Sequence, residues 1–170
     1  VVSTVVSRFA CRDSVYTFKL SRMGVRLGSM SDLTILRRLT PEDLTLTNAT
    51  VVKWNDSAQQ LVDLMESAGT SDFVVVDDHN KYCGMVTSED LRSALVYRES
   101  IPLLQVSELQ QSGLPTIAHE ETLDIVLDKF TKADVQALAL LGSKGEIEGL
   151  VTRSNLMARY QRALDEDSTQ

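Results

Sequence analysis

The sequence has few residues of the kinds that build cross-linked or metal-bound proteins. Its 170 residues include two cysteines, Cys11 and Cys83, which cannot form a disulfide framework and therefore favour a reducing compartment. The two histidines, His79 and His119, do not have the spacing of metal ligands, so we expect no metal site. Catalytic signatures are also missing, because the sequence has no nucleophile elbow, no Walker loop and no paired histidines. We therefore expect a protein that is not an enzyme.

Positive charge is scarce over most of the chain and concentrated at its start. The net charge of −7 argues against general nucleic-acid binding. Residues 1–40 carry a net charge of +5, whereas the remaining residues carry −12. The basic residues follow the apolar run VVSTVV, which is too short to span a bilayer, and a signal peptide would place its positive charges first. Two interpretations stay open: the cytosolic flank of a membrane span, and a solvated basic face such as an amphipathic surface helix.

An internal repeat organises the chain after residue 38. The phrase GMVTSEDL at 84–91 returns as GLVTRSNL at 149–156, 65 residues later. A shift of 65 aligns the two halves without a gap, and it pairs Leu39 with Leu104, Leu44 with Leu109, and Asp63 with Asp128. Two copies are too few for a solenoid, and a half of about 65 residues is only marginally stable alone. The repeat therefore predicts a closed pair that shares one interface.

Each half has the same predicted order of elements. An extended stretch at 50–54, or at 116–118, precedes a helix whose apolar residues recur at helical spacing. These residues are Ala58, Leu61, Val62 and Met65 in the first half, and Leu123, Val126, Leu127 and Phe130 in the second. Apolar runs on either side of the turn sequences DDHN and GSKG predict a hairpin, and a last helix begins at Ser88 or Arg153. The fold class is therefore α/β (α+β), in the order strand, helix, strand, strand, helix.

The repeated phrase predicts a capped helix start. Thr87 and Asp90 have the spacing of a capping box, and Thr152 can cap its helix in the same way with Asn155 as a poorer partner. This structural role is sufficient to explain the residue types.

The same residues also suit a ligand with a phosphate and a ribose. A helix start attracts phosphate, and the hydroxyl of Thr87 can donate a hydrogen bond to it. The carboxylate of Asp90 can accept hydrogen bonds from both vicinal hydroxyls of a ribose. Gly84 and Gly149, which begin the two phrases, would let the strand and a ligand approach closely.

The element order with a Gly-x-x-Thr-x-x-Asp/Asn phrase resembles a CBS domain, and two in tandem resemble a Bateman module, over residues 39–162. The resemblance implies binding of an adenine nucleotide (ATP, ADP or AMP) in pockets that both halves build. It implies one pocket lined by Thr87, Asp90, Thr116, Ile117, Gln136 and Ala137. It implies a second lined by Thr152, Asn155, Val51, Val52, Ser71 and Asp72. The Asp90 pocket is the better candidate, because Asn155 has one acceptor oxygen and no charge. A purely structural pair without ligand is the alternative.

The N-terminal segment 13–27 resembles the last membrane helix of bacterial ClC chloride channels and transporters. The matching residues are Ser14, Tyr16, Thr17, Lys19, Leu20, Arg22 and Gly24, with Val15 in place of an isoleucine. The resemblance implies that Tyr16 binds an anion in the intact protein. The alternative is that Tyr16 is an amphipathic residue on an apolar helix face.

These resemblances imply a cytoplasmic regulatory module of a ClC-type chloride channel or proton/chloride antiporter, at the cytoplasmic face of the membrane and joined to its membrane-embedded body. We expect a homodimer in contact through the last helices, at Leu91, Leu95, Leu156 and Tyr160, whose alternative role is internal core. The predicted parts are a membrane-helix end and basic linker (1–38), two repeats (39–99 and 100–164) and an acidic, disordered tail (165–170). The alternative function is a ligand-free module that holds subunits together in this or another protein.

Overall fold

The computed structural model describes residues 34–168, and the structural statements below concern this part of the chain. The chain divides into two units, Val1–Thr34 and Ile35–Gln170, of which the second contains both repeats. Tyr16 and the segment 13–27 lie outside the described residues. Within the described range, no helix combines the length and the apolar character needed to cross a bilayer.

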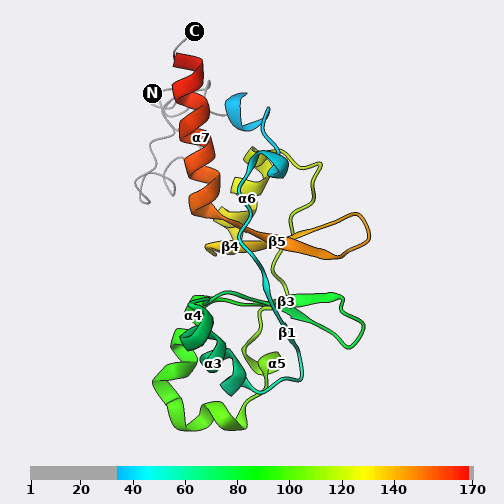
Figure 1. Cartoon of the computed structure of the whole chain (residues 1–170), viewed down its shortest axis with the longest axis vertical. Coiled ribbons are helices and arrows are strands. Elements are labelled where there is room, and N and C mark those ends of the chain that lie inside the picture. The colour runs from blue at the N-terminus through cyan, green and yellow to red at the C-terminus, as the bar shows by residue number, and fades with distance from the viewer. Residues whose placement is uncertain (1–33, 169–170) are drawn as a thin grey trace, which may run out of the picture. The chain divides into compact units, whose positions relative to one another are not determined.

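The first repeat forms a three-stranded sheet with two helices (Figure 1). Its elements are β1 (Thr50–Lys53), α3 (Ala58–Ala68), β2 (Phe73–Val76), β3 (Tyr82–Val86) and α4 (Ser88–Ala94). β1 runs parallel to β2, and β2 runs antiparallel to β3, so β2 is the central strand. The order of elements is the predicted one.

Alternate residues of β2 face two different buried clusters. Phe73 and Val75 pack with Leu61 of α3 and Leu91 of α4. Val74, on the opposite face of the strand, belongs to a cluster drawn from both repeats. The other members of that cluster are Met85, Ala137, Ala139 and Leu150. Because both faces of β2 are covered, its sequence is an uninterrupted apolar run, and the second cluster is the shared interface that the repeat predicts.

Helix α3 shows how local sequence sets the ends of an element. The hydroxyl of Ser57 accepts a hydrogen bond from the N–H of Gln59 (3.2 Å) and caps the first turn. Gly69 ends the helix at φ 65°, a left-handed conformation that glycine adopts without steric cost. Between these ends, the predicted apolar face turns Ala58, Leu61 and Val62 into the core.

The second repeat contains α6 (Leu123–Ala133), β4 (Ala137–Leu141), β5 (Ile147–Thr152) and α7 (Arg153–Ser168). β4 and β5 form an antiparallel pair, as the hairpin prediction required. The strand expected at 116–118 is reduced to one bridge, in which Ile117 pairs in parallel with Leu140. Pro115 precedes this stretch and has no N–H to donate, while the carbonyl of Thr116 accepts a hydrogen bond from Lys129 Nζ (2.6 Å) instead of from a strand. The extended pairing therefore stops at a single residue.

Each repeat is completed by the first residues of the other repeat. Leu123 N–H donates to the carbonyl of Leu39 (2.9 Å), and the equivalent Ala58 N–H donates to the carbonyl of Leu104 (2.9 Å). Further along the two segments, Thr47 pairs with Leu150 and Gln111 pairs with Met85. Thr47 and Gln111 are 64 residues apart, so the repeat shifts by one residue here. These segments also contain the short helices η1 (Pro41–Asp43) and α5 (Val106–Leu109), and η2 (Leu95–Leu103) follows α4.

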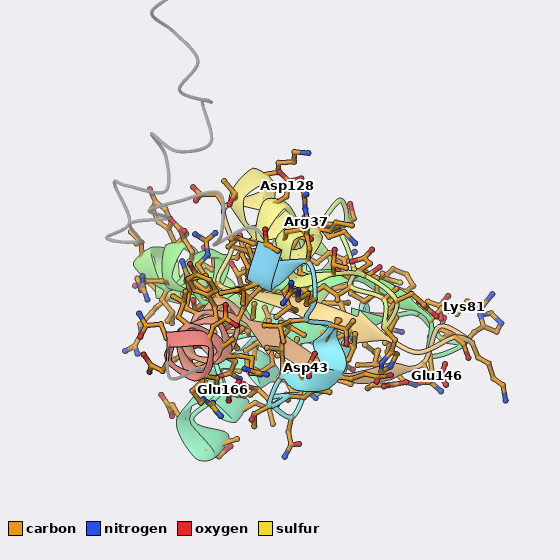
Figure 2. All side chains as sticks on the ribbon, turned by 90° about the horizontal axis from the view of Figure 1, so that it is seen from above. Arg37, Asp43, Lys81, Asp128, Glu146 and Glu166 are labelled. Carbon is orange, nitrogen blue, oxygen red and sulfur yellow. The ribbon has the colours of Figure 1, made fainter. Side chains whose placement is uncertain are left out.

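Side chains of residues 37–43, which precede β1, contact the second repeat and cap η1. Figure 2 shows Arg37 beside α6, where its Nε donates to Asp124 Oδ2 (3.2 Å). The carboxylate of Asp43 accepts a hydrogen bond from the N–H of Thr40 (2.9 Å) and closes a capping box around η1. The segment is therefore fixed by local capping as well as by its backbone pairing.

Two sequence-based expectations need correction. Leu91, Leu156 and Tyr160, which we expected at a dimer contact, are at most 5% exposed and form part of the chain's own core. The acidic tail was expected to be disordered from residue 165, but α7 continues to Ser168. Within this last stretch of α7, Arg159 Nη1 lies 3.7 Å from Glu166 Oε2, two helical turns further on.

Candidate functional site

Helix α4 begins with the capping box that the sequence predicts. The hydroxyl of Thr87 accepts a hydrogen bond from the N–H of Asp90 (3.3 Å), and Asp90 Oδ2 accepts one from the N–H of Thr87 (2.9 Å). The hydroxyl proton of Thr87 also points to Asp90 Oδ2 (2.7 Å). Thr87 is 6% exposed, so its hydroxyl is fixed in a buried position. The Asp90 carboxylate therefore has a single well-defined orientation.

The carboxylate of Asp90 has a partner that the sequence did not reveal. The side-chain amide of Gln111 donates to both Asp90 oxygens, with Nε2 at 2.9 Å from each. The backbone of Gln111 pairs with Met85 of β3, through bonds of 2.8 and 3.3 Å. Gln111 is 21 residues from Asp90 in the sequence, and no local pattern signals the contact.

Gly84 allows this crossing of the two backbones. A Cβ at Gly84 would lie 2.5 Å from the carbonyl oxygen of Gln111, which is closer than real Cβ contacts. At the equivalent Gly149, a Cβ would lie 3.1 Å from the carbonyl oxygen of Thr47. We predicted that both glycines let a ligand approach; what the structure shows close to each is the chain's own backbone.

Helix α7 begins with an equivalent threonine cap, but the side chain of Asn155 donates a hydrogen bond to its partner segment where that of Asp90 accepts one. The hydroxyl of Thr152 accepts a hydrogen bond from the N–H of Asn155 (3.2 Å). The side-chain amide of Asn155 donates to the carbonyl of Thr45 (2.6 Å), from the segment that completes the second repeat. A carboxylate cannot donate this hydrogen bond. The change from Asp90 to Asn155 therefore matches the change in partner, from an amide donor to a carbonyl acceptor.

The other residues expected around Asp90 lie along β4 and the strand-like residues before α6. Ile117 and Ala137 are buried, and the carbonyl of Gln136 accepts a hydrogen bond from Arg153 N–H (2.9 Å). The side-chain hydrogen bonds of Asp90 in the described structure end on Thr87 and Gln111, and do not extend to Thr116, Ile117, Gln136 or Ala137.

The side-chain hydrogen bonds of Asn155 end on Thr45 and Thr47 and do not extend to the other residues expected around it. Val51 and Val52 lie in β1, where Val52 is buried and Val51 is 46% exposed, and Ser71 is half-buried. Asp72 was expected to supply an acid near Asn155. Its Oδ1 accepts a hydrogen bond from the N–H of Ser88 (3.1 Å), at the start of α4. Free N–H groups at a helix start are strong partners for a carboxylate, which explains why Asp72 lies there.

Two hollows adjoin the pair of Asp90 and Gln111. The first, of about 370 Å³, is lined by Asp90 together with Tyr97 of η2 and Glu108 of α5. The second, of about 320 Å³, is lined by Gln111 together with Leu114 and Lys132. Sequence reasoning missed Tyr97, Glu108, Gln111 and Lys132, because they lie outside the repeated phrase.

A separate polar cluster lies at the turn of the second hairpin. His119 Nε2 is 2.6 Å from Glu148 Oε2, and its Nδ1 is 3.9 Å from Glu42 Oε1. Within residues 34–168, no three His, Cys, Asp or Glu side chains are arranged to hold a metal ion.

Burial shifts the pKa of two side chains, Tyr82 and Arg153. Burial raises the pKa of Tyr82 to about 12, and the charge of Cys83 adds to this effect. Burial lowers the pKa of Arg153, while the charge of Asp134 acts in the opposite direction. The guanidinium of Arg153 donates to the carbonyls of Phe130 (2.7 Å) and Val135 (3.4 Å), so its role here is structural.

The repeats match a known domain family. The sequence profile of the CBS domain matches residues 42–97 and 106–162. The chain belongs to the CBS domain family. The curated relatives include an inosine-5′-monophosphate dehydrogenase of Aquifex aeolicus, 28% identical over 66% of this chain and 22% of the relative. They also include a homoserine O-acetyltransferase of Methanococcus vannielii, 19% identical over 68% of this chain and 23% of the relative. The CBS pair thus spans less than a quarter of the length of these curated relatives.

Solved CBS structures share the fold. The conserved CBS domain protein TA0289 from Thermoplasma acidophilum superimposes with a TM-score of 0.63, at 17% identity over 78% of each chain. CBSX2, solved in complex with AMP, gives a TM-score of 0.59 at 20% identity, over 75% of this chain and 98% of that chain. CbpB, solved in complex with c-di-AMP, gives 0.60 at 15% identity, over 82% and 95% of the two chains.

Proposed function

We propose that this CBS pair is a regulatory module that binds an adenine nucleotide, such as ATP, ADP or AMP, at Asp90. The observation that carries the proposal is the oriented carboxylate of Asp90, held by Thr87 at the start of α4. Two vicinal ribose hydroxyls match the two acceptor oxygens of such a carboxylate. CBSX2 and CbpB, which share the fold, were solved with AMP and with c-di-AMP, and this supports an adenine nucleotide as the ligand class. The module acts by binding, without a catalytic residue of its own.

Isothermal titration calorimetry with ATP, ADP and AMP tests this proposal. Asp90→Ala should weaken binding about 10- to 100-fold, because hydrogen bonds to a charged acceptor contribute roughly 1.5–3 kcal/mol. Asn155→Ala should weaken it less. Asp43→Ala is the matched control, since it removes an equivalent capping-box carboxylate at η1 without touching the site. No heat with millimolar nucleotide, or equal losses in the Asp90 and Asn155 variants, would contradict the proposal.

For the parent protein, we propose a ClC-type anion channel or antiporter, with the CBS pair at the cytoplasmic face of the membrane and the whole assembled as a homodimer. The resemblance of segment 13–27 supports this, as does the net charge of +5 over residues 1–40. Nucleotide can shift gating only through different affinities for two states of the protein.

Chloride flux through the intact protein in vesicles tests the proposed parent. Nucleotide on the cytoplasmic side should change the flux, and Asp90→Ala should abolish that change while leaving the basal flux. An identical response of the wild type and Asp90→Ala would exclude the Asp90 site as the sensor.

A second candidate function is a ligand-free CBS pair that holds subunits together. The observation in its favour is that both polar positions of the repeated phrase are already satisfied within the chain. Asp90 is paired with Gln111, and Asn155 is paired with the carbonyl of Thr45. The calorimetric titration separates the two candidates, because this one predicts no binding.

A further inference from the structure

The lone pairs that a ribose would use are occupied by the chain itself. Gln111 Nε2 lies 2.9 Å from Oδ1 and 2.9 Å from Oδ2 of Asp90, so its amide spans both carboxylate oxygens. A vicinal diol would donate to the same two oxygens. We propose that Gln111 is an internal competitor of the nucleotide, so that binding at Asp90 requires the Gln111 side chain to leave. This inference rests on the proposed nucleotide-binding function.

The backbone around Gln111 is fixed while its side chain can turn. Gln111 and Met85 exchange two backbone hydrogen bonds (2.8 and 3.3 Å), and Gly84 lies directly beneath the Gln111 carbonyl. The side chain itself is only half-buried, and it ends on Asp90. A rotation of the side chain therefore breaks the contact with Asp90 without opening the strand pairing. Displacement of Gln111 therefore needs only a rotation of its side chain and no movement of the backbone.

The hollows that Asp90 and Gln111 line indicate what this rotation does to the site. Asp90 lines the hollow of about 370 Å³, and Gln111 lines the one of about 320 Å³. Each is at the small end of the roughly 300–1,000 Å³ usual for ligand pockets. When Gln111 turns away, the Asp90 carboxylate is exposed to a ligand in the hollow that Asp90 lines.

The competition sets a requirement on the ligand. A compound must offer Asp90 two donors to replace both contacts of the amide. AMP has the 2′ and 3′ hydroxyls, whereas 2′-deoxy-AMP has one donor and cannot replace both. 2′-Deoxy-AMP should therefore bind more weakly than AMP. Because displacing Gln111 from Asp90 costs the same free energy for either nucleotide, Gln111 lowers both affinities by the same factor. The Asn155 position has no such competitor, because its partner is the backbone carbonyl of Thr45 and its own amide is a donor.

Calorimetric titration of the whole chain with AMP and 2′-deoxy-AMP tests the inference. Gln111→Ala should bind AMP about tenfold more tightly than the wild type, because the charged acceptor no longer loses a hydrogen bond on binding. It should gain the same factor for 2′-deoxy-AMP, so that the preference for AMP is unchanged. Gln59→Ala is the matched control, since it removes another Gln–Asp contact, from Nε2 to Asp63 Oδ1 (3.0 Å), on α3. This control should bind as the wild type does.

The outcomes separate the inference from the function on which it rests. If AMP binds the wild type and Gln111→Ala equally, or the variant more weakly, Gln111 is not a competitor, although the nucleotide site stands. If AMP binds neither protein, the proposed function fails and the inference fails with it. Should Gln111→Ala not fold, the side-chain NH₂ signals of Gln111 in the wild type decide. AMP should move these signals to the positions of a solvated amide, and unchanged signals in the AMP complex would overturn the inference.

Discussion

Asp90 and Asn155 occupy equivalent positions in the two repeats but face partners of opposite hydrogen-bonding character. Asp90 accepts from the Gln111 amide, and Asn155 donates to the Thr45 carbonyl. The partners are 21 and 110 residues away in the sequence, so the sequence shows that the residues differ without showing why. We interpreted Asn155 as a weaker ribose ligand because its amide lacks the charge and the second acceptor oxygen of a carboxylate. In the structure, Asn155 uses the N–H donor that a carboxylate does not have.

The substitutions Asn155→Asp and Asp90→Asn should lower the free energy of unfolding by different amounts. Asn155→Asp places a carboxylate against the Thr45 carbonyl, and the loss of a donor between two acceptors should cost about 1–3 kcal/mol of unfolding free energy. Asp90→Asn should cost less, because the Gln111 amide can rotate and offer its oxygen to the new side chain. Urea unfolding of the two variants and the wild type at pH 7 measures both costs. Equal costs, or a larger one for Asp90→Asn, would contradict this account of the two positions.

At the scale of the elements, β3 and β5 each receive a crossing backbone at a glycine. Gly84→Ala should destabilise the chain by roughly 1–3 kcal/mol, since a Cβ would overlap the backbone of Gln111 and neither strand can move freely. Gly113→Ala is the control, because a Cβ there meets nothing within 4 Å. Its unfolding free energy should stay within about 1 kcal/mol of the wild type. Thermal and urea unfolding would show this difference, and two equally mild variants would mean that the crossing is looser than described.

The regular elements were predictable because their signals are local. The predicted apolar face of α3 depends on residues three and four apart, and the caps that the structure shows, Ser57 and Gly69, lie directly at the helix ends. The capping box of Thr87 and Asp90 is equally local, and the structure has it as predicted. We expected a strand at 116–118, but the structure has only one bridge, at Ile117. That bridge depends on β4, which lies further along the chain, and not on the local sequence. Signals that act over three or four residues were sufficient for helices and hairpins, and insufficient for isolated pairings.

At the scale of the whole described chain, the two repeats depend on each other. The segment containing Leu39 and Thr47 pairs with the second repeat, and the segment containing Leu104 and Gln111 pairs with the first. A cluster that includes Val74 and Leu150 buries apolar residues from both. The repeat in the sequence predicts a shared interface, but the exchange of these segments involves residues too far apart to be paired from one sequence. The same limit applies to the candidate site. Thr87 and Asp90 were predicted from the repeated phrase, whereas the distant partner Gln111 was not.

The central claim is that an adenine nucleotide binds at Asp90 by displacing Gln111, and NMR titration of the isotopically labelled chain with AMP tests it most directly. The account predicts that the backbone signals of Thr87 and Asp90 and the side-chain amide signals of Gln111 shift together with one affinity. It also predicts that the Asn155 side-chain signals move less at every AMP concentration. Saturable shifts confined to Thr152 and Asn155, or a spectrum that does not change at millimolar AMP, would contradict it.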